Sequence, residues 1–107
     1  MQHGKILYRY TIKNCKLFIH EGVVNDTGFR KLVNFKDGSP TQRCPRVEDL
    51  GKIRSVGQSL WLAERDDKKA MALFIAYETK KIEELNKQID RKLDIIAMLM
   101  RNEDLVI

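Results

Sequence analysis

Hydrophobic and polar positions alternate with a period of two near the start of the chain, in the segment KILYRYTIKNCKLFIH at positions 5–20. The intervening positions carry basic and hydroxyl side chains. Alternation of this kind is typical of a β-strand with one buried face. The apolar positions of the first strand are Ile6, Tyr8, Tyr10 and Ile12.

A two-residue turn at Asn14–Cys15 would join this strand to a second one. Asn tolerates the positive φ angles that tight hairpin turns require. The resulting register pairs Ile12 with Leu17, so that their side chains share one face of the sheet. By the same register, Tyr10 pairs with Ile19, and Arg9 pairs with His20.

Two further strands are predicted downstream. The segment 29–35, FRKLVNF, is one, and the turn signal KDGS follows it directly. The segment 59–63, SLWLA, is the other, with Trp61 or its neighbours in the core. Between them lies a loop-like stretch, 40–58, which contains both prolines of the chain.

From Asp66 the hydrophobic period changes to that of an α-helix. Asp66 or Asp67 can cap its start, and no Gly or Pro occurs between there and Arg101. At 100° per residue, eight apolar side chains fall close to one line along the helix, interrupted only by Glu78. They are Met71, Ile75, Ile82, Leu85, Ile89, Leu93, Ile96 and Met100.

The C-terminal end of this helix is apolar on more than one side. Residues 95–100 are all apolar, and Ile95, Met98 and Leu99 lie well off the main line. Core packing against a sheet accounts for the first half of the line but not for this end. A helix of about 36 residues is roughly 54 Å long, whereas a domain of this size is roughly 30–35 Å across.

The predicted self-association or partner surface at this end consists of Ile89, Leu93, Ile96, Leu99 and Met100. Three alternatives could cover it. A second copy of the chain would give a homodimer, another protein would give a complex, and the apolar tail 105–107 could fold back within the chain. The spacing favours antiparallel or short helix pairing over a left-handed heptad coil.

Together these elements predict an α+β fold, with an antiparallel sheet of three to four strands followed by one long helix. The organisation is a β region, 1–64, with the basic loop 40–58, then the helix and a short apolar tail, 65–107. A chain of 107 residues fits one small domain. The N-terminus lacks the apolar core of a signal peptide, and no apolar run is long enough for a membrane span. We therefore expect a cytoplasmic protein with reduced cysteines.

The net charge of +5 is unevenly distributed. Residues 1–65 hold twelve Lys and Arg against six Asp and Glu, whereas residues 66–107 hold eight against nine. A basic cluster in the loop could contact phosphates or an acidic protein surface. Its members, the candidate partner-binding residues, are Arg43, Arg46, Lys52 and Arg54.

No catalytic or metal-binding pattern is predicted, and no cofactor is expected. The two histidines, His3 and His20, and the two cysteines, Cys15 and Cys44, match no zinc-ligand spacing. A general acid–base or nuclease-type cluster of His20, Glu21 and Asp26 is the weaker alternative to ordinary solvated side chains. The segment GKIRSVGQS, 51–59, lacks the Gly-Lys-Ser/Thr ending of a P-loop.

The run SLWLAERDDKKAMALFIAYETKKIEELNKQI, following CPRVEDLGKI, resembles small accessory proteins of phages and conjugative elements of Gram-positive bacteria. These proteins also open with a Tyr-rich strand, as in ILYRYTI here. The resemblance covers most of the chain but transfers no functional residues. It implies a bacterial host cytoplasm and a role such as inhibition of host defence, for example an anti-CRISPR function, by binding rather than catalysis.

The sequence therefore predicts a non-enzymatic binding protein whose partner is a host or defence protein, for example an effector that itself binds nucleic acid. Direct binding of nucleic acid by the basic loop is the alternative.

Overall fold

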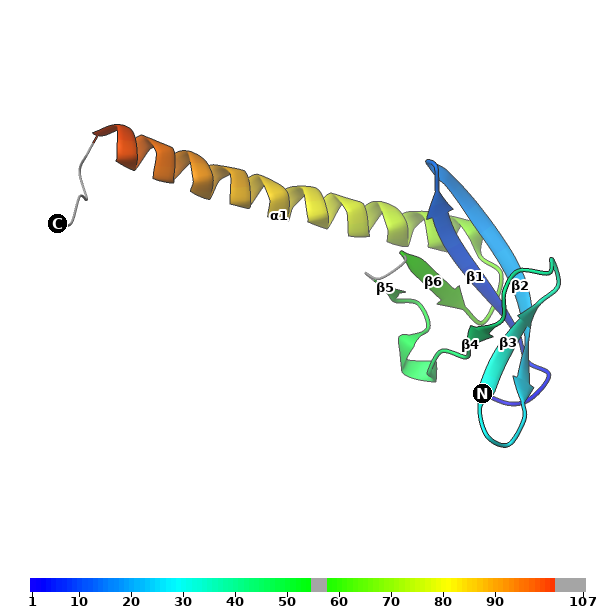
Figure 1. Ribbon diagram of the computed structural model, residues 1–107. Coiled ribbons are helices and arrows are strands. Elements are labelled where there is room, and N and C mark those ends of the chain that lie inside the picture. Colours follow the sequence, from blue (N-terminus) through cyan, green and yellow to red (C-terminus); the bar gives the residue numbers. More distant parts are fainter. Residues whose placement is uncertain (55–57, 102–107) are drawn as a thin grey trace. The chain divides into compact units, whose positions relative to one another are not determined.

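The computed structural model describes residues 1–54 and 58–101, which form an antiparallel six-stranded sheet and one long helix (Figure 1). The strands are β1 (Ile6–Lys13), β2 (Lys16–Asp26), β3 (Lys31–Phe35), β4 (Gln42–Arg43), β5 (Ile53–Arg54) and β6 (Ser59–Leu62). A short 3-10 helix, η1, spans Val47–Asp49, and the α-helix α1 spans Asp67–Arg101. The chain divides into two compact units, Met1–Phe74 and Ile75–Ile107, which are described separately.

The predicted N-terminal hairpin is confirmed in its turn and its register. Asn14 and Cys15 both have positive φ, at 53° and 60°. Ile12 pairs with Leu17, and Arg9 pairs with His20. The tight turn therefore fixes which side chains of β1 and β2 share a face.

The sheet is larger than the three to four strands expected from the sequence. Its order is β4-β3-β2-β1-β6-β5, so β6 lies beside β1 although the two are far apart in the chain (Figure 1). The strands missed by the sequence are β4 and β5, which have two residues each. Two residues cannot show a period of two, so these strands form only because β3 and β6 offer them backbone partners.

Both faces of the sheet are buried, and each has its own hydrophobic cluster. The first cluster contains Leu7, Val24, Val33, Phe35 and Trp61. The second contains Tyr10, Leu60, Leu62, Ala70 and Phe74. Neighbouring residues of a strand point to opposite faces, which is why Trp61 and the leucines on either side of it belong to different clusters.

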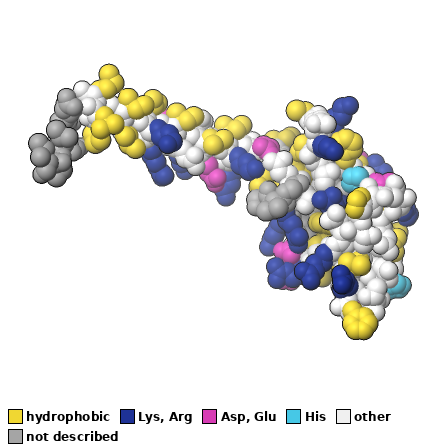
Figure 2. Space-filling view, in the orientation of Figure 1, with side chains coloured by type: hydrophobic (Ala, Val, Ile, Leu, Met, Phe, Trp, Pro, Cys, Tyr) yellow, Lys and Arg dark blue, Asp and Glu magenta, His cyan; other side chains and the backbone are white. Residues whose placement is uncertain are grey.

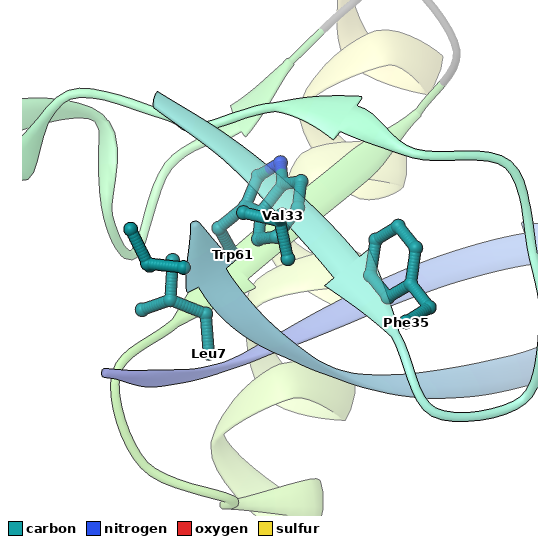
Figure 3. Packing of buried hydrophobic residues seen from close by; sticks show 5 residues of the cluster. Leu7, Val33, Phe35 and Trp61 are labelled. Atoms are coloured by element: carbon teal, nitrogen blue, oxygen red, sulfur yellow. The ribbon is translucent and has the colours of Figure 1, made fainter. Parts of the chain in front are cut away.

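In the first cluster, Phe35 stacks on Trp61 with ring centroids 5.8 Å apart (Figure 3). Leu7 lies in the same cluster and is fully buried, whereas Ile6 is 40% exposed. The expectation that Ile6 marks the only buried face of β1 is thus wrong. The simple alternation fails here because the sheet is covered on both sides.

The start of α1 is fixed by side-chain hydrogen bonds. The Asp66 carboxylate accepts a hydrogen bond from the backbone N–H of Lys69 at 3.0 Å, which confirms Asp66 as the cap. The buried Tyr10 hydroxyl donates to the Asp67 carboxylate at 2.8 Å and accepts from the Asp66 N–H at 3.1 Å. These bonds tie strand β1 to the first turn of the helix.

Candidate functional site

The first turns of α1 bury a different face from the one that carries the apolar line. Ala70 and Phe74 are 0% and 4% exposed and belong to the second core cluster. Met71 and Ile75 follow them by one position, about 100° further round the helix, and are 49% and 67% exposed. The apolar line is therefore not the core-facing side of the helix.

All apolar side chains of this line, from Met71 to Met100, are about half exposed or more. We call the line the apolar stripe; Glu78 is its one polar position. Its members beyond the first turns are Ile82, Leu85, Ile89, Leu93, Ile96 and Met100, each between 52% and 79% exposed. Figure 2 shows hydrophobic side chains along one edge of α1 and basic side chains along the other. The expectation that core packing covers the first half of the stripe is wrong, because Ala70 and Phe74 occupy that role.

Two apolar side chains outside the stripe are also exposed near the end of the helix. Ile95 is 53% exposed and Leu99 is 62% exposed, whereas Met98 is partly covered. The tail 105–107, which could fold back over this end, lies outside the described residues. An exposed apolar surface of this length is unusual on a monomeric protein and typically marks a contact surface.

The basic segment forms a hollow of about 330 Å³ on the sheet-bearing unit, near the short strands β4 and β5. The structure brings together three of the four predicted cations there: Arg43, Arg46 and Arg54. Lys52 is exposed nearby in the chain but does not line the hollow. Sequence proximity predicted this grouping correctly, with one member outside it.

A carboxylate that lines the hollow alters its electrostatics. Asp49 accepts hydrogen bonds from Arg46 at 3.2 Å and from Arg54 at 3.3 Å. The Arg46 guanidinium, in particular, lowers the pKa of Asp49, so this carboxylate stays ionised. Two of the arginines are therefore already paired, and the hollow is less positive than the count of its cations suggests.

The suggested acid–base cluster is not assembled by the fold. His20 and Glu21 are neighbours on β2 and point to opposite faces of the sheet. Glu21 forms an ion pair with Lys36, whereas His20 Nδ1 lies 2.5 Å from a carboxylate oxygen of Asp37. The backbone N–H of Asp26 donates instead to Nδ1 of the other histidine, His3.

The His20–Asp37 pair was not predicted from the sequence, because it depends on the pairing of β2 with β3. The Asp37 carboxylate also accepts the backbone N–H of Ser39 at 2.9 Å. Hydrogen bonding by Ser39 and His20 holds the pKa of Asp37 well below its ordinary value. Both Asp37 and Ser39 approach the same ring nitrogen of His20, an arrangement unlike a catalytic triad, in which the orienting carboxylate and the nucleophile contact different ring nitrogens of the histidine base.

Cys15 is exposed in the hairpin turn, and Cys44 is half-buried against the first core cluster. Burial raises the pKa of the Cys44 thiol. Within residues 1–54 and 58–101, no three His, Cys, Asp or Glu side chains are grouped as a metal site would require. Part of the segment 51–59, considered above as a phosphate loop, lies outside the described residues.

The predicted third strand, 29–35, begins too early, because Phe29 lies outside β3. Phe29 was expected to open the third strand but lies in the β2–β3 turn, 98% exposed. The turn is held by the Thr27 hydroxyl, which donates to the Arg30 carbonyl at 3.1 Å, and by the Gly28 N–H, which donates to Asp26 at 3.0 Å. The turn signal TG at 27–28 could have indicated this.

In the part of the chain that the structure describes, no helix is both long and apolar enough to cross a membrane. Comparisons with protein-family models, curated proteins and solved structures found no match for this chain.

Proposed function

We propose that this chain is a non-enzymatic binding protein that acts by protein–protein contact. The observation that carries the proposal is the apolar stripe of α1, whose side chains are about half exposed or more along most of the helix. Exposing so many neighbouring Ile and Leu side chains to water is unfavourable. Binding to another protein surface would remove them from water.

The basic hollow supplies a second contact of different chemistry. Arg43 lines it without an ion pair among the described residues, whereas Arg46 and Arg54 share Asp49. An acidic protein surface suits such a site, because carboxylates can accept hydrogen bonds from several guanidinium groups at once.

The biological setting of the proposal comes from the resemblance to phage and mobile-element accessory proteins. On that basis the chain acts in the cytoplasm of a bacterial host and occupies a defence protein, as an anti-CRISPR protein does. A defence effector that normally holds nucleic acid would itself be basic at its binding channel and acidic elsewhere, so the arginines would engage its acidic part.

The test is a plaque assay in a Gram-positive strain whose CRISPR system targets the infecting phage. Expression of the wild-type chain is expected to raise the plaque count. Arg43→Glu combined with Arg54→Glu is expected to abolish the rise, whereas Lys87→Glu, an exposed helix position outside both surfaces, should keep it. An unchanged plaque count with the wild-type chain present at normal levels contradicts the anti-defence role.

Direct binding of nucleic acid is the second candidate, favoured by the three arginines around one hollow. Phosphate contacts release counterions, so the logarithm of the affinity should fall with log salt by about 0.9 for each contact on duplex DNA. Changing Arg43 and Arg54 to Gln should reduce this slope by about 2. Absence of binding to DNA and RNA at low salt removes this candidate.

A further inference from the structure

The spacing of the apolar stripe is symmetric about Ile89. Stripe positions lie four and seven residues before Ile89, at Leu85 and Ile82, and four and seven residues after it, at Leu93 and Ile96. Eleven residues away on either side are Glu78 and Met100. This stretch of about 33 Å is one continuous helix within the unit Ile75–Ile107.

A pattern that reads the same in both directions is what a two-fold antiparallel pair requires. In such a pair each side chain must meet a suitable side chain of the other copy at the mirrored position. Centred on Ile89, the layers are Ile89 with Ile89, Leu85 with Leu93, and Ile82 with Ile96. Every inner layer is thus formed by Ile and Leu side chains that are more than half exposed in the single chain.

The one polar member of the stripe fits the same arrangement. The mirrored position of Glu78 is Met100, so in an antiparallel pair Glu78 lies at the outer end of the contact, where its carboxylate can reach water. A parallel pair would instead place Glu78 directly against Glu78 of the other copy. Two carboxylates facing each other in an apolar seam are unfavourable, which argues against the parallel arrangement.

A second observation concerns the apolar side chains beside the stripe. Tyr77 and Ile95 are eighteen residues apart, as are Lys81 and Leu99, which is five full helical turns. All four therefore lie along the same flank of α1. Lys81 already covers the Tyr77 ring, with its Nζ 4.5 Å from the ring centroid.

An antiparallel pair brings this flank of one helix against the same flank of the other. The mirrored position of Leu99 is 79, midway between Tyr77 and Lys81 of the second copy. Leu99 would then pack on the Tyr77 ring and the aliphatic part of Lys81. A parallel pair would instead turn Leu99 toward the opposite flank of the other copy, away from Tyr77 and Lys81, with Ala97 nearest in height.

We propose that the occupant of the apolar stripe is a second copy of this chain, paired antiparallel through α1 with Ile89 at the two-fold axis. The inference rests on the proposed function only in taking the stripe as a contact surface. The proposed layers of the pair are formed by residues of the unit Ile75–Ile107, whereas the basic hollow belongs to the unit Met1–Phe74. Such a dimer presents two hollows, which strengthens binding to a partner with two acidic sites.

Disulfide cross-linking tests the register. Single cysteines are placed at 85, 89 or 93 by Leu85→Cys, Ile89→Cys and Leu93→Cys. The background carries Cys15→Ser and Cys44→Ala, the latter chosen because Cys44 packs on the core. Two forms that differ in mass are mixed and mildly oxidised, and the native helix content of each is checked by circular dichroism.

The expected result is a self-cross-link of Ile89→Cys and a mixed cross-link between Leu85→Cys and Leu93→Cys. Leu85→Cys alone should not cross-link. Position 85 of one copy faces position 93 of the other, so the two cysteines at position 85 are eight residues apart, about 12 Å along the helix axis. That separation is beyond the reach of a disulfide. Self-cross-links of both Leu85→Cys and Leu93→Cys would overturn the proposal in favour of a parallel pair.

Absence of any cross-link at high protein concentration would also overturn the proposal, and would leave another protein or the tail 105–107 as the occupant of the stripe. The plaque assay distinguishes the two proposals. Antiparallel cross-links without a rise in plaques contradict only the defence role, whereas a rise in plaques without cross-links contradicts only the dimer.

Discussion

The packing of β2 against β3 leaves no room for a side chain at Gly22. A Cβ at this position would overlap Cγ1 of the fully buried Val33 and lie 3.1 Å from Cδ1 of Phe35. Neither group can move away, because both lie in the first core cluster. We expect Gly22→Ala to lower the free energy of unfolding by about 1–3 kcal/mol, measured by urea denaturation.

A double-mutant cycle checks the cause of this loss. Val33→Ala removes the methyl group that the new Cβ would overlap and leaves a small cavity of its own. The two changes together should cost less than the sum of their separate costs. Simple additivity would contradict the proposed overlap.

Asp37 makes the stability of the sheet unit dependent on pH in a definite direction. Because Ser39 and His20 lower its pKa in the folded state, folding is favoured when the carboxylate is ionised. This contribution is complete above the ordinary pKa of 3.8 and is lost as the pH falls below it, toward the folded value. Asp37→Asn should therefore be less stable than wild type at pH 6.

The same comparison in acid provides the control. Urea denaturation of the two proteins at pH values from 6 down to 2 should show their difference in stability shrinking as the pH falls. A difference that stays constant over this range would mean that the Asp37→Asn substitution perturbs packing rather than charge.

At the scale of elements, Tyr10 joins strand β1 to the start of α1. Its hydroxyl contacts both Asp66 and Asp67, and burial together with the hydrogen bond to Asp67 raises its pKa. Tyr10→Phe keeps the buried ring and removes only the hydroxyl. We expect a loss of about 1–2 kcal/mol in the free energy of unfolding.

Amide hydrogen exchange locates the effect of this change. The first turn of α1, near Asp67, should exchange faster in Tyr10→Phe than in wild type, while the β1–β2 hairpin keeps its protection. Tyr8→Phe is the matched control, because Tyr8 is only half-buried beside the same cluster. Equal effects of the two variants would show that the hydroxyl of Tyr10 does not anchor the helix.

The elements that could be predicted from the sequence are those with their own local signal. The hairpin turn at Asn14–Cys15 and the cap at Asp66 are specified by neighbouring residues, and the structure confirms both. Strands β4 and β5 have no such signal, since each exists only through pairing with a longer strand. The buried position of Leu7 also depends on a second covered face of the sheet, which the chain pattern alone does not reveal.

The candidate surfaces, too, were predictable only in those features that have a local signal in the sequence. The apolar stripe was visible as a helical period, and its end was predicted to be a contact surface. The sequence did not show that Ala70 and Phe74, rather than the stripe, face the core. Their closeness in the sequence correctly grouped the arginines of the hollow. The pairing of Asp49 with both Arg46 and Arg54 could not be predicted, because it depends on how η1 and β5 fold together. The His20–Asp37 pair joins β2 to the turn that follows β3 and could not be found without the pairing of the two strands.

At the scale of the whole molecule, the chain combines a well-packed sheet unit with a helix whose apolar stripe stays exposed among the described residues. A contact that uses both the stripe and its flank accounts for four of the six apolar residues at 95–100, more than a single core-facing side would require. Stripe and flank each use part of this run: Ile96 and Met100 belong to the first, Ile95 and Leu99 to the second.

Sedimentation equilibrium tests directly whether this helix face is a contact between two copies of the chain. The wild-type chain, of 12.5 kDa, should sediment at twice that mass. Ile96→Glu should sediment as a monomer, whereas Met98→Glu, two positions along on the opposite side of the helix, should remain a dimer. A wild-type mass of 12.5 kDa at every concentration, or a dimeric Ile96→Glu with native helix content, would contradict a dimer formed through this face.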